Sequence, residues 1–311
     1  MGFKTFIEEV RAEVQNKCLD KKVVIHDILK NNDVKLTGIT IVEEGKAVSP
    51  NIYLERYYDE YCSGVQLEII ADSIINEWSR HCEDVDYSII ESLRDYEKIK
   101  DRIVLKLINR KSNIKRLKGI AYEEYLEDFA LICYISIDLN SNIEEGSGSV
   151  NVTNGMLEQW NISKEEMFKQ AYDNTMRLNK HLVKRLDDVI LDIMKSKNND
   201  MSEIEDMIHS IVDNDIKMLV LTTVNNINGA VVVIYDEVLD ELAHIIGKSF
   251  YLIPSSIHEW IIVNEDISEE NTRNITNMLI EVNASELDEQ EKLSDNLYMY
   301  DFNEKKIKIA K

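Results

Sequence analysis

The sequence predicts an α+β protein in which helices cover antiparallel sheets. Short segments rich in β-branched residues occur in pairs around Asn, Gly or Pro turns, which is the pattern of β-hairpins. Each pair precedes a segment with apolar residues at helical spacing, and this strand-turn-strand-helix unit recurs from near Val23, Met218 and Phe250. Because the units share little residue identity, we interpret them as a common local element and not as an internal duplication. A chain of 311 residues with 44% hydrophobic content is long enough for about two domains.

The first half of the chain predicts a mixture of helices and strands. Apolar residues at helical spacing between Phe3 and Val14 predict an opening helix over 3–17. The turn-forming cluster Asn31-Asn32-Asp33 separates two β-rich runs, Val23 to Leu29 and Val34 to Val42, and predicts a hairpin. The remaining elements expected here are helices over 52–61, 65–82 and 88–100 and strands over 103–108 and 129–137.

Residues 140–149 have the composition of a linker, because Glu, Gly and Ser dominate the centre of this stretch. We therefore expect an N-terminal α+β domain over 1–140 and a C-terminal α+β domain over 141–311. The boundary is predicted at the linker itself.

The second domain is expected to begin with a long helical hairpin near 163–213. Ser163 and Ser202 are each followed three residues later by a glutamate, which is the capping-box signature of a helix start. The first helix is expected to continue to about Lys195, and the second to cover 204–212.

Two further hairpins and two helices are expected after residue 217. Asn/Gly and Pro/Ser clusters mark the turns, and Gly247 is a natural helix end. The expected elements are strands over 218–224 and 230–235, a helix over 236–246, strands over 250–253 and 259–264, and a helix over 268–282.

Charge and composition favour an acidic, cytoplasmic, bacterial protein. Asp and Glu number 58 against 36 Lys and Arg, which gives a net charge of −22. Wholesale coating of nucleic acid is therefore not expected, because phosphate attracts basic surfaces. The first residues do not form an export signal, and no apolar run approaches the roughly 20 residues of a transmembrane helix. Four scattered cysteines fit a reducing compartment.

Basic residues are concentrated between Arg94 and Lys118. This window holds ten basic residues against three acidic ones, a net charge of +7, so the rest of the chain carries −29. The candidate binding residues taken from it are Arg94, Lys98, Lys106, Arg110, Lys111, Lys115 and Arg116.

Two interpretations of this basic segment remain open. It either docks onto acidic parts of this chain or of a second copy, or it binds an anionic partner such as RNA, DNA or an acidic protein. Tyr96 is the only aromatic residue in the window, so base stacking has little support and the structural interpretation is favoured.

The segment from Pro254 to Trp260 gathers the residue types of a hydrolase. Its candidate catalytic residues are Ser255, Ser256, His258 and Glu259. In an extended strand Ser256 and His258 share one face while Glu259 points to the other, so the local triad is incomplete. A hydrolase would need a carboxylate from elsewhere in the chain. The alternative is a hairpin turn whose hydroxyls bond the backbone.

No metal site and no cofactor are predicted. The set Cys62, His81, Cys82 and Cys133 lacks the spacing of zinc motifs, and the acidic pairs lack the pattern of a calcium loop. No glycine-rich phosphate motif occurs. We expect the thiols to be reduced and buried as soft apolar groups.

Three segments resemble an uncharacterised bacterial family found mainly in gut clostridia. They are Tyr235 to Ala243, Phe250 to Glu259 and Leu293 to Asp301. Trp160-Asn161-Ile162-Ser163, with Ala171 and Asn174, extends the resemblance over most of the chain, and it is sharpest over 235–301. Since that family has no assigned reaction, the resemblance implies no activity, cofactor or catalytic residue.

The leading hypothesis is a non-catalytic cytoplasmic protein that binds another protein or a second copy of itself. In one form of this hypothesis, an acidic face mimics nucleic-acid phosphates and inhibits a basic partner, as inhibitors of mobile-element origin do. The alternatives are a hydrolase that uses Ser255 or Ser256 with His258, and nucleic-acid binding through residues 94–118. No membrane partner is expected.

Overall fold

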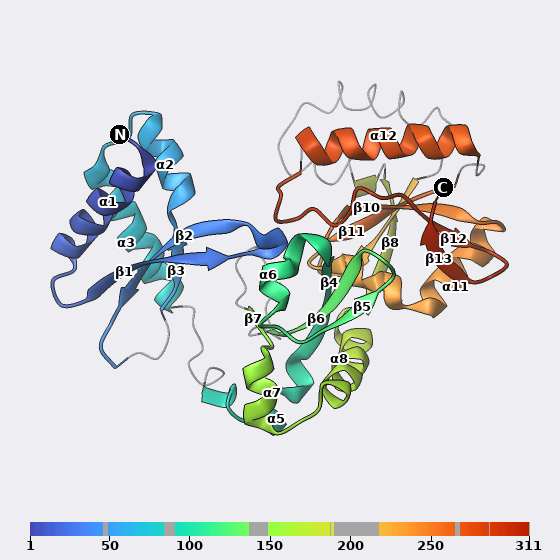
Figure 1. Ribbon diagram of the computed structural model, residues 1–311, viewed down its shortest axis with the longest axis horizontal. Helices are drawn as coiled ribbons and strands as arrows, with labels where there is room; N and C mark the ends of the chain where they lie inside the picture. The colour runs from blue at the N-terminus through green and yellow to red at the C-terminus, as the bar shows by residue number, and fades with distance from the viewer. Residues whose placement is uncertain are drawn as a thin grey trace. The chain divides into compact units, whose positions relative to one another are not determined.

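The computed structural model describes residues 1–45, 49–83, 91–136, 149–186, 188–189, 218–264, 268–285 and 287–310 (Figure 1). The chain divides into two compact units, Met1–Arg94 and Asp95–Lys311. Both units combine helices with antiparallel strands, so the predicted α+β class is confirmed. The division at residue 94 differs in place from the boundary expected at 140–149, a stretch that falls within the range of the second unit.

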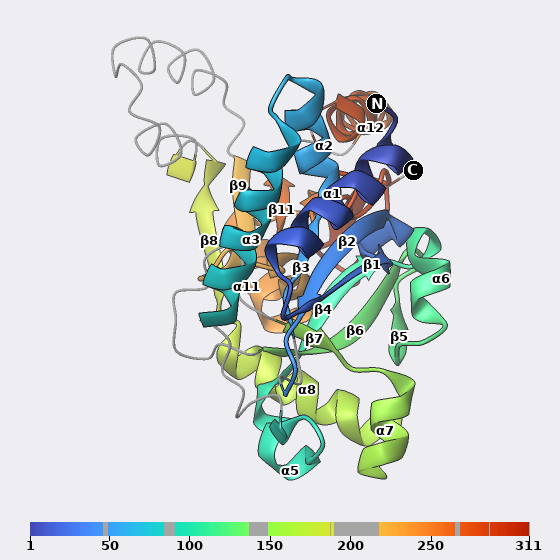
Figure 2. The ribbon, with the colours of Figure 1, turned by 90° about the vertical axis from the view of Figure 1, so that its left-hand side faces the viewer.

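In the N-terminal unit, helices pack on a three-stranded antiparallel sheet with the order β1-β2-β3. The elements are α1 (Phe3–Lys17), β1 (Lys22–Leu29), the 3-10 turn η1 (Asn31–Asp33), β2 (Lys35–Val42), β3 (Asn51–Tyr53), α2 (Leu54–Cys62) and α3 (Leu67–Glu83). Figure 2 shows α1 and α3 side by side, and these two helices contact each other directly. Phe6, Val10 and Val14 of α1 are fully buried in the core of this unit, as their helical spacing predicts.

The first hairpin confirms its sequence prediction. Strands β1 and β2 pair antiparallel with Leu29 opposite Lys35. Asn32 and Asp33 in the connecting turn have φ values of +58° and +54°. Asn and Asp tolerate this left-handed region better than other non-glycine residues, which explains why this cluster turns the chain.

The second unit contains two further antiparallel sheets. Its first elements are α5 (Tyr96–Ile99), η2 (Lys100–Arg102), β4 (Ile103–Asn109), η3 (Lys111–Asn113), α6 (Ile114–Leu117), β5 (Tyr122–Tyr125), β6 (Phe129–Ser136), β7 (Ser149–Asn151), α7 (Asn154–Trp160) and α8 (Lys164–Leu178). They are followed by β8 (His181–Arg185), β9 (Met218–Thr223), η4 (Gly229–Ile234), α11 (Asp236–Ile246), β10 (Phe250–Ser256), β11 (Glu259–Val263), α12 (Glu269–Ser285), β12 (Tyr298–Asp301) and β13 (Lys306–Ile309).

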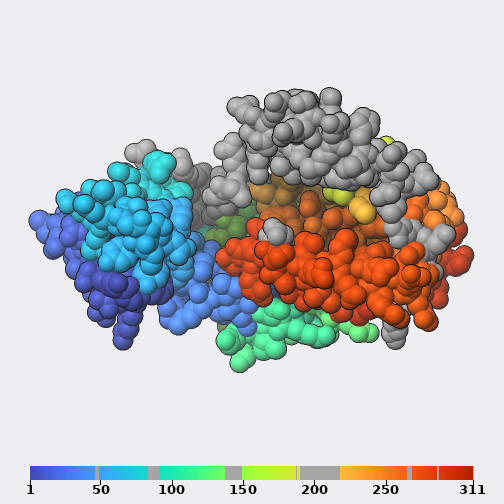
Figure 3. Space-filling model, turned by 90° about the horizontal axis from the view of Figure 1, so that it is seen from above, coloured from blue at the N-terminus to red at the C-terminus, as the bar shows by residue number. Residues whose placement is uncertain are grey.

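The two sheets of this unit share a packed interior. One has the strand order β13-β12-β10-β11-β9-β8, and the other has the order β4-β6-β5 with β7 also paired to β6. Phe129 of β6 contacts Trp260 of β11 and Tyr298 of β12, with ring centroids 5.8 Å and 5.2 Å away. Aromatic contacts of this kind bury large apolar areas, so these rings join the two sheets. Helix α12 lies at the surface of the unit (Figure 3).

The expected long helix from Ser163 to Lys195 is wrong over residues 179–185. It starts as predicted, because the Ser163 hydroxyl accepts a hydrogen bond from the Glu166 amide at 3.1 Å. It ends at Leu178, and His181–Arg185 forms β8 on the edge of the larger sheet, paired with β9. The apolar spacing fits both structures, and strand pairing decides between them. The second helix of the predicted hairpin, 204–212, lies outside the described residues.

The expected strand over 230–235 is also wrong. Residues Gly229–Ile234 form the 3-10 helix η4, and all six are buried. A Cβ at Gly229 would lie 2.3 Å from the Thr222 hydroxyl and 2.4 Å from the His258 carbonyl oxygen, so only glycine fits here. An unbroken apolar run does not distinguish a buried strand from another buried element.

Other predictions are confirmed in part. Helix α11 ends at Ile246 and is capped by Gly247, which has φ +77°, and β10 and β11 form a hairpin followed by α12. The turn of this hairpin lies at Ile257-His258 and not at Pro254-Ser255-Ser256 as expected, because β10 continues to Ser256. The helix expected over 88–100 is wrong in part: within the range described from residue 91, residues 93–95 are not helical and α5 covers Tyr96–Ile99. None of the helices in the described ranges has both the length and the apolar content to cross a membrane.

Candidate functional site

The serine and histidine candidates lie at the turn between β10 and β11. The Ser256 hydroxyl accepts a hydrogen bond from the His258 backbone amide at 3.0 Å. The imidazole Nδ1 accepts another from the Asn228 amide at 3.1 Å, while Nε2 lies 3.7 Å from a Glu291 carboxylate oxygen. Ser255 donates weakly to Glu259, at 3.5 Å. The structure therefore places all four candidates in one turn.

These contacts are those of a structural turn. A general base needs a free imidazole nitrogen that faces the nucleophile, with the other nitrogen held by a carboxylate. In His258 the nitrogen without the carboxylate already accepts a backbone N–H, and the Ser256 oxygen also accepts one. Burial raises the pKa of the Glu259 carboxyl, and the Ser255 hydroxyl opposes this. The geometry supports a role in which these side chains form hydrogen bonds with backbone groups of the turn, and it does not support nucleophilic attack.

The basic segment does not form one continuous surface. Strand β4 separates its two ends by about 20 Å, the length of seven extended residues. Figure 1 shows α5 and α6 at opposite ends of β4. Lys98 lies in α5, Lys106 is half-buried within β4, and Arg110 begins the α6 end. The net charge of +7 is therefore divided between separate places.

Local acidic residues neutralise part of this charge. Lys98 lies 3.7 Å from Asp95, and Lys100 lies 2.5 Å from Glu97. At the other end, Arg110 pairs with Glu124 at 2.5 Å. These are surface pairs, and such pairs contribute about 0 to 1 kcal/mol of stability. Arg94, an exposed residue, belongs to the N-terminal unit.

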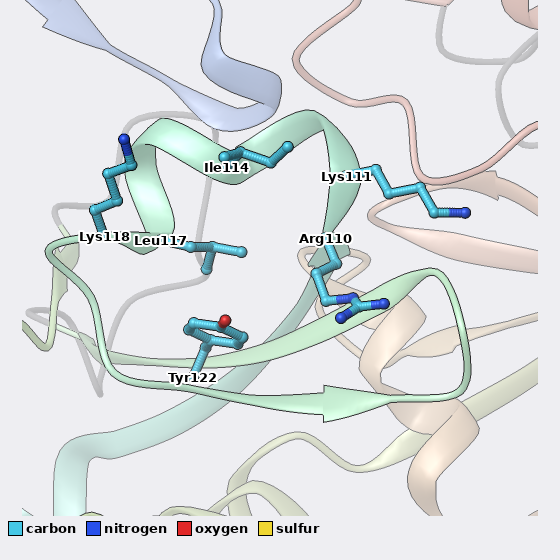
Figure 4. A pocket seen from close by; sticks show the side chains of 6 residues that line it. All are labelled: Arg110, Lys111, Ile114, Leu117, Lys118 and Tyr122. Atoms are coloured by element: carbon cyan, nitrogen blue, oxygen red, sulfur yellow. The ribbon is translucent and has the colours of Figure 1, made fainter.

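A hollow of about 420 Å³ lies beside α6, and we call it the α6 pocket. It is lined by Arg110, Lys111, Ile114, Leu117, Lys118 and Tyr122. Figure 4 shows Leu117 and Tyr122 facing each other across it, with Lys118 and Lys111 at opposite ends. Ile114 is 61% exposed. The lining thus combines three cationic side chains with an apolar floor.

The α6 pocket includes both predicted and unpredicted residues. Arg110 and Lys111 were candidates from the basic window, whereas Lys115 and Arg116 are near neighbours on α6 that do not line the hollow. Lys118 and Tyr122 were not among the candidates. The signal that could have found Lys118 is its helical spacing from Ile114 and Lys111, which places the three on one side of the segment.

A buried carboxylate lies behind the pocket. The Asp128 side chain is 4% exposed and accepts hydrogen bonds from Tyr298, from Asn296 at 2.6 Å and from Lys111 at 3.0 Å. Burial by itself would raise the pKa of Asp128, but these three donors outweigh it and the pKa is lowered. The ionised carboxylate thereby holds the ammonium group of Lys111 and joins β12 to the start of β6.

The comparisons with known proteins return one family. Its model, described as a family of unknown function (DUF5688), matches residues 3–302. The chain belongs to DUF5688. This confirms the resemblance to an uncharacterised family over most of the chain. No curated protein and no solved structure matches the chain.

The residues that carry the DUF5688 resemblance have structural roles. Tyr235 donates its hydroxyl proton to the carbonyl oxygens of Thr175 and Asn179, both at 3.0 Å. Asn174 bonds two carbonyl oxygens at the start of β4, and Tyr300 bonds Asp240. Conspicuous segments of this sequence are thus explained by the fold. The α6 pocket lies outside them.

Proposed function

We propose that this DUF5688 protein is a non-catalytic binding protein that holds an acidic segment of a partner protein at the α6 pocket. One observation carries the proposal. Among the residues that the structure describes, the lining of this 420 Å³ hollow includes three cationic side chains, an exposed isoleucine and a tyrosine, and no acidic side chain. Hollows with apolar walls and a few convergent polar groups are the usual form of binding sites.

The chemistry of the lining suits a carboxylate on an aliphatic stem. Lys118 is exposed and has no salt bridge within the described ranges, so it is available to an incoming anion. Arg110 is held by Glu124, whose side chain is 58% exposed, and a partner carboxylate can replace it at small cost. The methylene groups of a glutamate would then pack on Ile114 and Leu117.

A nucleic-acid partner is a second candidate. It is favoured by the five basic residues in the nine positions from Arg110 to Lys118. Tyr122 is the one aromatic side chain among the described residues of the lining, and nucleic-acid grooves usually offer several stacking surfaces. The separation of the two basic ends by β4 also limits the number of simultaneous phosphate contacts. We therefore favour an acidic protein.

The inhibitor form of the hypothesis rests on the acidic remainder of the chain. The residues outside the basic window carry a net charge of −29, and such a charge attracts the molecule to basic grooves. Competition between this protein and duplex DNA for a nuclease would test it. Binding that does not weaken with added salt would rule out phosphate mimicry.

Fluorescence polarisation of a labelled decaglutamate peptide tests the α6 pocket. We expect saturable binding to the wild-type chain that weakens with salt, because exposed charges are screened. Lys118→Glu should weaken it by about fivefold or more, since one reversal removes an attraction and adds a repulsion.

Lys169→Glu is the matched control. Lys169 is exposed on α8, and its reversal makes the same charge change without touching the pocket lining. Equal effects of the two substitutions would contradict the proposal, because the net charge alone would then explain binding. A labelled dodecathymidylate serves as the nucleic-acid probe. If it bound more tightly than the peptide and Lys118→Glu abolished its binding, the partner at the α6 pocket would be a nucleic acid and not an acidic protein.

A further inference from the structure

A second groove lies in the N-terminal unit between α1 and the outer edge of β1, and we call it the α1–β1 groove. Its volume is about 450 Å³. It is lined by Lys4, Ile7, Glu8 and Arg11 of α1 and by Lys22, Val23, Val24 and Ile25 of β1. Four consecutive residues of one strand line it together with one side of a helix. The groove therefore follows the edge of the sheet.

Strand β1 is an edge strand with unpaired backbone groups. The sheet order is β1-β2-β3, so β1 has a neighbouring strand on one side within the described ranges. In an antiparallel pair, alternate residues direct their N–H and C=O groups to the partner strand. Val23 belongs to the outward set, because its amide donates to Gln15 and its carbonyl accepts from Arg11.

The outward set continues along the strand at Ile25, Asp27 and Leu29. No partner for their outward N–H and C=O groups is found within the described part of the chain. The unpaired edge therefore runs from Ile25 to Leu29, and an exposed strand edge is a template for another strand. Strand addition to an exposed edge is a common mode of peptide recognition.

The charges along the groove select the peptide. Lys4, Arg11 and Lys22 are exposed, and in the described ranges none of them forms a salt bridge. Glu8 is the single acidic residue among the described residues of the lining. A lining of net charge +2 on a chain of net charge −22 is complementary to an acidic segment.

We propose that the α1–β1 groove binds an extended acidic peptide of a partner protein, which adds to the sheet beside β1. Its backbone pairs with Ile25 and with the outward groups that follow. Its apolar side chains contact Ile7 and its carboxylates approach Lys4, Arg11 and Lys22. Acidic residues belong at the Lys22 end, because Asp27 at the other end already pairs with Lys35 at 2.6 Å.

Backbone methylation tests strand addition directly. A labelled octapeptide of alternating valine and glutamate is titrated against the full chain, with two derivatives in which either all valine or all glutamate amides are N-methylated. Alternate amides of an added strand face the edge. One derivative should therefore bind at least about tenfold more weakly than the other. Equal binding of both derivatives would overturn the proposal.

Substitutions locate the site. Lys22→Glu should weaken binding about fivefold, whereas Arg80→Glu, the same charge change at an exposed position of α3, should not. Asp27→Pro removes an outward N–H and should weaken binding about fivefold relative to Asp27→Ala. The alanine control separates the loss of the Asp27 carboxylate from the loss of its amide. Equal binding by the proline and alanine variants would count against the edge.

Two results separate this inference from the α6 pocket and from self-association. Lys118→Glu should leave the octapeptide affinity unchanged. If Lys118→Glu weakened octapeptide binding and Lys22→Glu did not, the octapeptide would bind at the α6 pocket. That result would overturn this inference and leave the proposed function standing. Sedimentation of the chain without peptide should show no self-association through the β1 edge. If the wild-type chain did self-associate and Asp27→Pro abolished this, a second copy of the chain, and not an acidic peptide, would occupy the groove.

Discussion

The buried carboxylate of Asp128 connects residues that are 168 and 170 positions away in the sequence. Asp128 forms no sequence motif with its partners Asn296 and Tyr298, because they are so far apart in the chain. The sequence alone therefore could not show that they pair. Their contact explains why the Ser294 to Tyr298 stretch stands out in the sequence. It holds β12 against β6 and fixes the position of Lys111 beside the α6 pocket.

Asp128→Asn should lower the free energy of unfolding by about 1 to 3 kcal/mol at neutral pH, because charge-assisted hydrogen bonds are lost. The folded pKa of Asp128 is lowered, so its contribution is present above the unfolded pKa of about 4 and disappears as the pH falls through the folded value. Urea denaturation across pH 3 to 7 measures this. The difference between wild type and variant should shrink below about pH 4. A constant difference would contradict the role of the charge.

The serines of the β10–β11 turn offer a matched pair. Ser256→Ala should lower the free energy of unfolding by about 1 kcal/mol, since the His258 amide loses its acceptor. Ser255→Ala should change it by less than about 0.5 kcal/mol, because its bond to Glu259 is long. Chemical denaturation of both variants checks this. A larger loss in Ser255→Ala than in Ser256→Ala would refute the structural interpretation of the turn.

At the scale of elements, the sequence predicted those helices and strands whose ends are set by nearby turn or capping residues. Helix α1, the β1–β2 hairpin, α11 with its Gly247 end, and α12 all agree with their patterns. The errors fall where tertiary contacts decide. Strand β8 is paired with β9, and Gly229 at the start of η4 lies where Thr222 and His258 leave no space for a Cβ.

The candidate site was predictable only in part. Composition identified Arg110 and Lys111 but extended the basic segment over β4, which divides it. Tyr122 lines the α6 pocket because β5 runs beneath α6, and the spacing of residues in the sequence does not predict this arrangement. The α1–β1 groove could not be predicted, because an unpaired edge is known only once the strand order is known.

Gly229→Ala tests the packing of η4. A methyl group there meets the Thr222 hydroxyl and the His258 carbonyl at less than contact distance, so the free energy of unfolding should fall by about 2 kcal/mol or more. Gly155→Ala in α7 is the control, because its Cβ would lie 3.9 Å from the Thr153 hydroxyl oxygen, an ordinary van der Waals contact, and alanine favours a helix. Thermal or urea unfolding should show stabilisation of about 0.5 to 1 kcal/mol for this control. Similar losses in both variants would be inconsistent with η4 as described.

At the scale of the whole molecule, the two compact units each have a hydrophobic core. The described residues that form the core of the N-terminal unit all belong to that unit, and they include Phe6, Ile39, Leu54 and Ile74. We therefore expect a fragment of residues 1–94 to fold by itself. Circular dichroism should show cooperative thermal unfolding of the fragment. A fragment without a cooperative transition would mean that its core depends on the second unit.

The net charge of −22 also acts at this scale. It is the sum of an acidic remainder and basic residues that the fold distributes over separate places, including the lining of the α6 pocket and of the α1–β1 groove. Such a molecule repels anions in general and admits them where cations and apolar side chains occur together. Binding at these places should therefore be weaker at high salt and selective for anions that carry apolar groups.

Hydrogen–deuterium exchange of the full chain with and without decaglutamate is the most direct test of the binding account. The proposal predicts slower exchange in residues 110–122, around the α6 pocket, and no change in residues 254–259, around the serine and histidine turn. Lys118→Glu should abolish the protection and Lys169→Glu should retain it. Protection at 254–259 without protection at 110–122 would contradict the assignment of the site.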